Sequence, residues 1–125
     1  MPANDTNLET AFTAADYVKV ATDDGNYVDQ SATSENWIFE FKNQNTNNTD
    51  KIKAHWKGQT DIAPSSSTVY LQIYNRSTNL WVTLTSDSTT AADTDFSLDG
   101  TQFFNVTDYY DASNWVSCRV YQEAK

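Results

Sequence analysis

The residue types that most often carry catalysis are sparse in this chain and form no familiar catalytic pattern. The one histidine, His55, lies between Lys53 and Lys57 with no carboxylate beside it in the sequence, which favours an exposed strand histidine over a general base. The run Ser65–Ser67 lacks the flanking glycines of a serine-hydrolase nucleophile elbow. The 17 acidic residues leave a glycosidase pair of carboxylates open, but most of them fall in turns. We therefore expect that the protein is not an enzyme.

Any metal site in this sequence depends on oxygen ligands, because a single Cys and a single His are too few for zinc. Oxygen donors gather in two acidic loops, and neither loop has the spacing of an EF-hand. We expect no obligatory cofactor, although these loops leave a structural Ca²⁺ ion open beside the simpler interpretation of solvated turns. The candidate ligands are Asp23, Asp24, Asn26 and Asp29 in the first loop and Asp93, Asp95 and Asp99 in the second.

Aromatic and polar side chains alternate with apolar ones on two predicted strands, so they share the outward faces of those strands. Exposed aromatic rings with polar neighbours are typical of sugar sites on β-sheets. The other interpretation is that the N-terminal segment, another strand or a neighbouring subunit covers these faces. The candidate binding residues are Tyr70, Gln72 and Tyr74 on one strand and Trp115, Arg119 and Tyr121 on the other.

Basic side chains are concentrated on a third predicted strand, where Lys51, Lys53 and Lys57 form one row with His55. Such a row can protect a sheet edge against aggregation. Alternatively, it can contact an acidic loop of another copy and so help subunits to assemble. We therefore add the three lysines to the candidate partner-binding residues.

Length and charge limit the remaining classes of function. A chain of 125 residues fits one domain, and a net charge of -9 argues against nucleic acid as a partner. No apolar run approaches the roughly 20 residues of a membrane span, and the N-terminal residues do not resemble a signal peptide. Cys118 has no second cysteine to pair with, so we expect a buried thiol in the core.

The elements that must position these residues are short β-strands separated by turns. Residues 1–16 carry no strand signal and are interpreted as an N-terminal extension: a short helix with Thr6 and Glu9 at capping-box spacing, an arm reaching a neighbour, or a frayed end. Residues 17–125 are interpreted as a single β-domain with seven or eight strands, which indicates a sandwich or barrel. The expected strands cover residues 17–20, 36–42, 51–57, 67–75, 80–84, 96–98, 102–106 and 114–122, with hairpin turns at 75–79 and 99–100.

The alternating residues of these strands predict the core. Its expected members are Trp37, Phe39, Phe41, Ile52, Trp56, Val69, Leu71, Ile73, Val116, Cys118 and Val120. For the strand at residues 80–84, apolar side chains fall on both faces, so the alternation does not say which face points inward.

Two segments resemble a known class of domain. Ser67–Asn75, followed by the turn and Leu80–Leu84, is similar to a hairpin of jelly-roll, galactose-binding-like β-sandwich modules, and Tyr109–Tyr121 looks like their closing strand. Such modules occur on microbial surface proteins and in phage virions as decoration and fibre proteins. The resemblance implies an antiparallel β-sandwich of the jelly-roll type and a non-enzymatic role, without matching a ligand-binding motif.

Together these observations predict a structural or attachment module of a virus particle, of the capsid-decoration or fibre type, or of an extracellular assembly. Its expected partners are other copies of itself or a capsid or fibre protein, and its expected location is a virion or an extracellular surface. A lone cysteine suits assembly in reducing cytosol. The alternative is a carbohydrate-binding module that recognises glycans through the outward aromatic rows.

Overall fold

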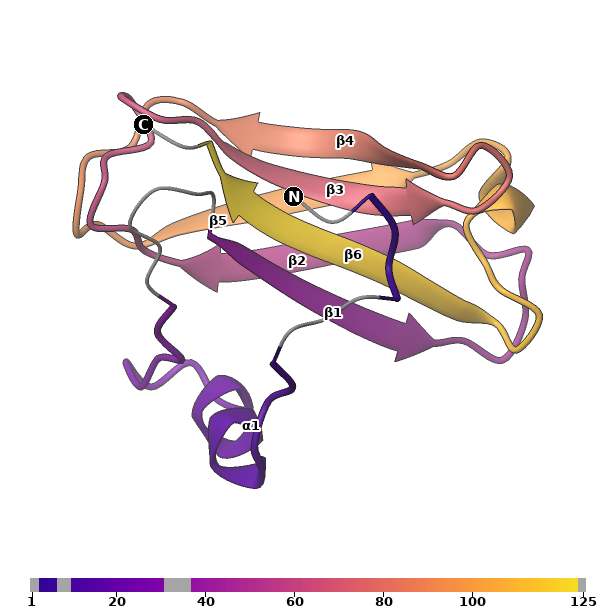
Figure 1. Ribbon diagram of the computed structural model, residues 1–125, viewed down its shortest axis with the longest axis horizontal. Helices are drawn as coiled ribbons and strands as arrows, with labels where there is room; N and C mark the ends of the chain where they lie inside the picture. The colour runs from indigo at the N-terminus through magenta and orange to yellow at the C-terminus, as the bar shows by residue number, and fades with distance from the viewer. Residues whose placement is uncertain (1–2, 7–9, 31–36, 124–125) are drawn as a thin grey trace.

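The protein is mainly β, with six strands in two antiparallel sheets and one short α-helix in the part of the chain that the structure describes (Figure 1). The structure is a computed structural model, and it describes residues 3–6, 10–30 and 37–123. The elements are α1 (Ala14–Val20), β1 (Ile38–Gln44), β2 (Ile52–Gly58), β3 (Val69–Asn75), β4 (Leu80–Asp87), β5 (Phe96–Gln102), the 3₁₀-helix η1 (Val106–Asp108) and β6 (Trp115–Gln122).

The strands pair in a nested order. β1 pairs with β6, β2 with β5, and β3 with β4. A further pairing of β3 with β6 joins four strands into one sheet in the order β1-β6-β3-β4, while β2 and β5 form the second sheet. The two sheets pack together in a β-sandwich-like arrangement (Figure 1). The expectation of an all-β sandwich is confirmed at this level.

The core lies between the sheets and follows the predicted alternation. Val69, Leu71 and Ile73 of β3 are fully buried, and Val116, Cys118 and Val120 of β6 pack beside them. From the smaller sheet, Ile52 and Ala54 are buried and Trp56 packs against the core. The expected core is thus confirmed in its main part. It also contains residues that we did not predict, namely Phe96, Leu98, Tyr109 and Tyr110.

The two long sides of the sandwich differ. On one side β5 packs against β4, and the approach is so close that a Cβ atom on Gly100 would lie 2.5 Å from Leu84 Cβ. β1 and β2, on the other side, have no comparable packing contact. The sandwich is therefore closed along β4 and β5 and open along β1 and β2.

The described residues form six strands rather than the expected seven or eight, because two local predictions are wrong. Tyr17–Val20 belongs to helix α1 rather than to a strand, because Thr13 and Asp16 form a capping box that starts a helix. Asp99 and Gly100 do not form a hairpin turn, since β5 runs through both residues and pairs along its length with β2. Gly100 serves close packing against Leu84 instead of turn formation.

The predicted turn at residues 75–79 is confirmed. The Asn75 side chain accepts hydrogen bonds from the backbone N–H groups of Ser77 and Thr78, at 3.0 and 3.1 Å. Asn79 adopts a positive φ of 58°, a conformation that Asn tolerates better than most residues. This tight turn sets the register of β3 against β4.

A chain of aromatic contacts connects α1 to both sheets. Tyr17 of α1 packs on Phe12, which packs on Phe39 of β1. From Phe39 the contacts continue through Trp37 to Trp56 of β2. In the described part of the chain, no helix has the length and apolar character needed to cross a membrane.

Candidate functional site

The predicted aromatic and polar binding residues lie on the outer face of the four-stranded sheet, the face turned away from β2 and β5. Tyr70 of β3 lies directly opposite Tyr121 of β6, and Gln72 lies opposite Arg119. The Tyr70 and Tyr121 rings stack with centroids 5.0 Å apart, and the Tyr70 hydroxyl donates to Glu123 at 2.9 Å. The structure therefore brings four of the six predicted residues into contact.

Arg119 is the centre of this group. Its guanidinium lies over the rings of Trp81, at 4.3 Å, and Tyr121, at 5.3 Å. Arg119 Nε donates to Gln72 Oε1 at 2.9 Å, and Gln72 Nε2 donates to Thr83 at 2.9 Å. Burial lowers the pKa of Arg119, and the electrostatic influence of Tyr121 and Glu40 only partly opposes this shift.

Of the two interpretations of these outward rows, exposed or covered, the covered one holds for three residues. Gln72, Tyr74 and Arg119 are 8, 6 and 4% exposed. Strand alternation predicts correctly that Gln72 and Arg119 point away from the core, but it does not show that the Trp81 and Tyr121 rings lie against Arg119. Trp115 stays 38% exposed at the start of β6 and is separate from the group.

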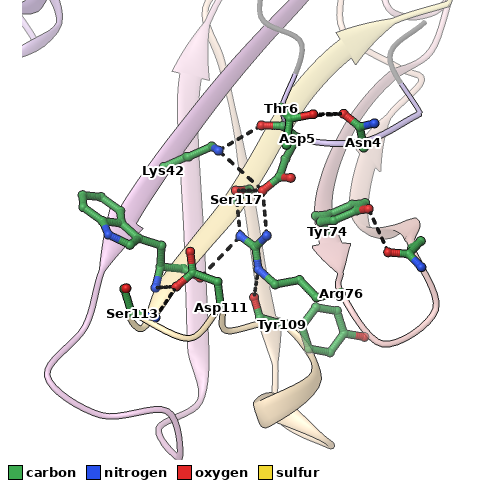
Figure 2. A network of polar contacts seen from close by, with 12 residues as sticks. Asn4, Asp5, Thr6, Lys42, Tyr74, Arg76, Tyr109, Asp111, Ser113 and Ser117 are labelled. Carbon is green, nitrogen blue, oxygen red and sulfur yellow. Dashed lines mark hydrogen bonds and ion pairs between the residues drawn. The ribbon is translucent and has the colours of Figure 1, made fainter.

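The N-terminal residues contribute a buried carboxylate to the same face, as Figure 2 shows. Asp5 is 4% exposed. Its Oδ2 accepts a hydrogen bond from Ser117 at 2.7 Å and pairs with Arg76 at 2.8 Å. Lys42 Nζ lies 3.5 Å from the same oxygen and donates to the Asp5 carbonyl at 2.9 Å. Asp5 thereby fixes residues 3–6 to β1, β6 and the loop after β3.

The Asp5 carboxyl is held in its charged form. Burial by itself raises the pKa of Asp5, but the Ser117 hydroxyl and the Arg76 guanidinium outweigh it, so the pKa lies below the ordinary value. A buried carboxylate with this many donors is a satisfied charge.

Arg76 links the Asp5 cluster to the loop before β6 (Figure 2). Its Nε donates to the Tyr109 carbonyl at 3.3 Å, and its Nη2 donates to Ser117 Oγ at 3.1 Å. The guanidinium also lies 5.6 Å from the centre of the Tyr74 ring. Sequence reasoning missed both Asp5 and Arg76, because a polar terminus and a hairpin loop carry no periodic signal that places them on the sheet.

Glu40 of β1 differs from Asp5. Both of its carboxylate oxygens are buried without a hydrogen-bond partner. Burial raises the pKa of Glu40 above its ordinary 4.5, and the charge of Lys42 only partly opposes this. Trp81 Nε1 is likewise buried without a partner. The outer face thus contains one satisfied and one unsatisfied carboxylate.

The predicted lysine row lies on the outward side of β2 and is exposed, as expected. Two of its four side chains already contact a carboxylate within the chain. Lys57 Nζ lies 2.7 Å from Asp23, and His55 Nδ1 lies 2.6 Å from Asp99. No carboxylate lies beside His55 in the sequence, but the fold brings Asp99 next to it. Both side chains are well exposed. Lys51 lies 5.9 Å from the centre of the Phe103 ring.

Three of the candidate Ca²⁺ ligands already have protein partners. Asp23 pairs with Lys57, and Asp95 accepts a hydrogen bond from Tyr27 at 2.9 Å. Asp99, expected in a loop, lies in β5 and contacts His55. Within residues 3–6, 10–30 and 37–123, no three His, Cys, Asp or Glu side chains are grouped so that they hold a metal ion.

A cleft of about 410 Å³ opens along β1 and β2. Its walls include the apolar residues Phe41, Ile52, Ala54 and Val116, and also Cys118. Cys118 is 4% exposed, and burial raises the pKa of its thiol to about 12. The prediction of a buried core thiol is confirmed, and this cysteine is not a reactive one.

The fold and these contacts define a mainly β protein with two antiparallel sheets packed as a sandwich. A scan against protein-family models gives no match, and searches of the curated proteins and of the solved structures give none either.

Proposed function

We propose that this protein is a non-enzymatic structural or attachment module of a virus particle, of the capsid-decoration or fibre type, or of an extracellular assembly. In this role it binds other copies of itself or a capsid or fibre protein. The observation that carries the proposal is helix α1, which buries none of its residues.

α1 exposes apolar side chains that its own fold does not cover. Tyr17, Val18 and Val20 are 62, 74 and 54% exposed. The helix has only seven residues, whereas isolated helices below about 12–15 residues are marginal in water. A partner that covers these side chains stabilises the helix and accounts for their exposure.

The opposite end of the sandwich supports the same role. Leu80 begins β4, Phe103 and Phe104 directly follow β5, and Trp115 begins β6. Figure 1 shows that these strand ends lie at one end of the sandwich, away from α1. All four side chains are exposed. A module with apolar contacts at both ends suits a repeating or stacked assembly.

The nested strand pairing supports the finer assignment of the sandwich as a jelly roll. In a jelly roll a folded ribbon of antiparallel strands wraps into two sheets, and here the first strand pairs with the last, the second with the fifth and the third with the fourth. This agrees with the resemblance of residues 67–84 and 109–121 to modules of virion and surface proteins.

Sedimentation velocity over a range of concentrations tests the proposal. We expect the parent protein to self-associate, and we expect Val18→Lys combined with Val20→Lys to shift the distribution towards monomer. Ala15→Lys is the matched control, because Ala15 is an exposed residue of the same helix without a large apolar side chain. A parent that stays monomeric at every concentration, alone and with any capsid or fibre protein of its source, contradicts the proposal.

Carbohydrate binding is the weaker candidate. Gln72 and Arg119 already hydrogen-bond to each other, and Tyr74 is buried, so this part of the predicted row offers little to a sugar. Trp115 remains exposed. A glycan array with the parent and Trp115→Ala separates the two functions, since only a carbohydrate-binding module gives a signal that the substitution removes.

A further inference from the structure

We infer that the open side of the sandwich is a site for strand addition, where an extended acidic segment of a partner protein pairs with the free edge of β2. The inference rests on the proposed function and names the chemistry of one contact in the assembly. Three features carry it: the unpaired edges of two strands, the cleft between them, and the charge along β2.

The strand order leaves both edges unpaired. β1 is the terminal strand of the larger sheet and β2 is an edge strand of the smaller one. In the described part of the chain, no strand pairs with the second edge of either. An edge strand turns the N–H and C=O groups of every second residue away from its partner, and those groups are a template for another strand. Gln30 already accepts from the Ile38 N–H of β1, at 2.8 Å, so β2 is the better template.

The smaller sheet also does not cover the whole inner face of the larger sheet. β5 packs against β4 and β3, and β2 is the next strand of the smaller sheet. Among the described residues, therefore, no strand lies opposite the inner face of β1. The cleft occupies this position, and Phe41, Ile52 and Ala54 line it. A third strand beside β2 extends the smaller sheet over β1 and buries these side chains. Two-stranded sheets are marginal, and a third strand stabilises them.

The charge along the cleft selects the chemistry of that strand. Lys51 and Lys53 are exposed and line the cleft, whereas Lys57 at the other end of β2 is paired with Asp23. Side chains of an added strand alternate between the two faces of the sheet. Acidic residues on one face meet Lys51 and Lys53, and apolar residues on the other enter the cleft. The segment is therefore an extended one in which Asp or Glu alternates with Val, Ile or a similar residue.

The experiment uses the full chain and a synthetic peptide. The probe is a seven-residue peptide with blocked ends in which Glu alternates with Val, as long as β2 itself. Calorimetric titration measures its affinity, and hydrogen exchange measures protection of the β2 amides. We expect binding together with slower exchange along β2. A peptide of the same composition with its Glu residues in one block, and one with alternate amides N-methylated, are expected to bind at least about tenfold more weakly.

Substitutions of the protein test the charge separately. Lys53→Glu is expected to weaken peptide binding about fivefold, as the loss and reversal of an exposed ion pair predicts. Lys19→Glu is the matched control, since it makes the same charge change on α1, and it is expected to leave the affinity unchanged. Circular dichroism verifies that both variants are folded.

Several results overturn the inference. The inference is wrong if the alternating peptide does not bind. It is also wrong if the N-methylated peptide binds as tightly as the alternating one, because an acidic peptide is then adsorbed without strand pairing. Binding with unchanged exchange of the β2 amides also overturns it, as does preferential binding of a short-chain fatty acid in the same cleft. Self-association through α1 is measured without peptide, so failure of strand addition and failure of the proposed function are distinguishable.

Discussion

The inner and outer faces of the four-stranded sheet both exclude water, but they do so by different chemistry. On the inner face, Val69, Leu71 and Ile73 of β3 are fully buried against other apolar side chains. On the outer face of the same strands, Gln72, Ser117 and Arg119 are 8, 0 and 4% exposed, and each forms hydrogen bonds to other side chains. Successive residues of one strand therefore point into two different interiors, one apolar and one polar.

The difference shows what each face depends on. Apolar burial is non-directional and roughly additive over area, so the inner face tolerates rearrangement as long as its volume stays filled. A polar interior is stable only when every donor and acceptor has a partner. On the outer face Asp5 meets that condition, whereas the Glu40 carboxylate has no hydrogen-bond partner. The three predictions below use this contrast.

The largest effect is expected on the inner face. Leu71→Ala removes a side chain with no exposed surface, and we expect a loss of about 3 kcal/mol in the free energy of unfolding, because a cavity remains. Urea denaturation measures the loss. Gln72→Ala, one residue along β3, is the matched outer-face variant and is expected to cost about 2 kcal/mol, because it removes two hydrogen bonds, one with Arg119 and one with Thr83. Equal losses contradict the contrast between the faces.

An intermediate effect is expected at Asp5. Asp5→Asn leaves Arg76 and Ser117 without their shared carboxylate, and we expect a loss of about 2 kcal/mol at neutral pH. Because the pKa of Asp5 in the folded protein lies below its ordinary 3.8, this stabilisation is present above pH 3.8 and is lost as the pH falls below it. Urea denaturation at several pH values measures the difference from the parent, which is expected to shrink in acid.

Asp29→Asn is the control for this prediction, because Asp29 is exposed and the substitution makes the same charge change. It is expected to stay within about 0.5 kcal/mol of the parent. A loss at Asp5→Asn that is independent of pH shows that the side chain contributes packing and that its charge contributes little.

The sequence predicted the inner face well and the outer face only in part. The alternation of apolar and polar residues in Val69–Ile73 and Ile52–Trp56 predicts which side chains face the core, because successive side chains of a strand point to opposite faces. The same alternation placed Gln72 and Arg119 opposite the core. Their burial depends on Trp81, Tyr121 and other groups that come from elsewhere in the chain.

The remaining misses have the same physical origin. Asp5 precedes Ser117 by 112 positions, and no local pattern connects them. Tyr17–Val20 has strand composition, but the capping box at Thr13 and Asp16 decides in favour of a helix. In β5, Asp99 and Gly100 resemble a hairpin turn, yet long-range pairing with β2 continues the strand.

The smallest effect, and the one of opposite sign, is expected at Glu40. Glu40→Gln removes a buried charge whose oxygens have no hydrogen-bond partner, so we expect a gain of about 1 kcal/mol at neutral pH. The pKa of Glu40 is raised above 4.5 in the folded protein, so the parent is penalised only as the pH rises through that raised pKa, and the two proteins converge below pH 4.5. Urea denaturation across this range, with Asp29→Asn as the exposed control, measures the gain. A loss of stability at neutral pH contradicts this prediction. It shows instead that the charges of Arg119 and Lys42 stabilise the Glu40 carboxylate through space, so that Glu40 is as well compensated as Asp5.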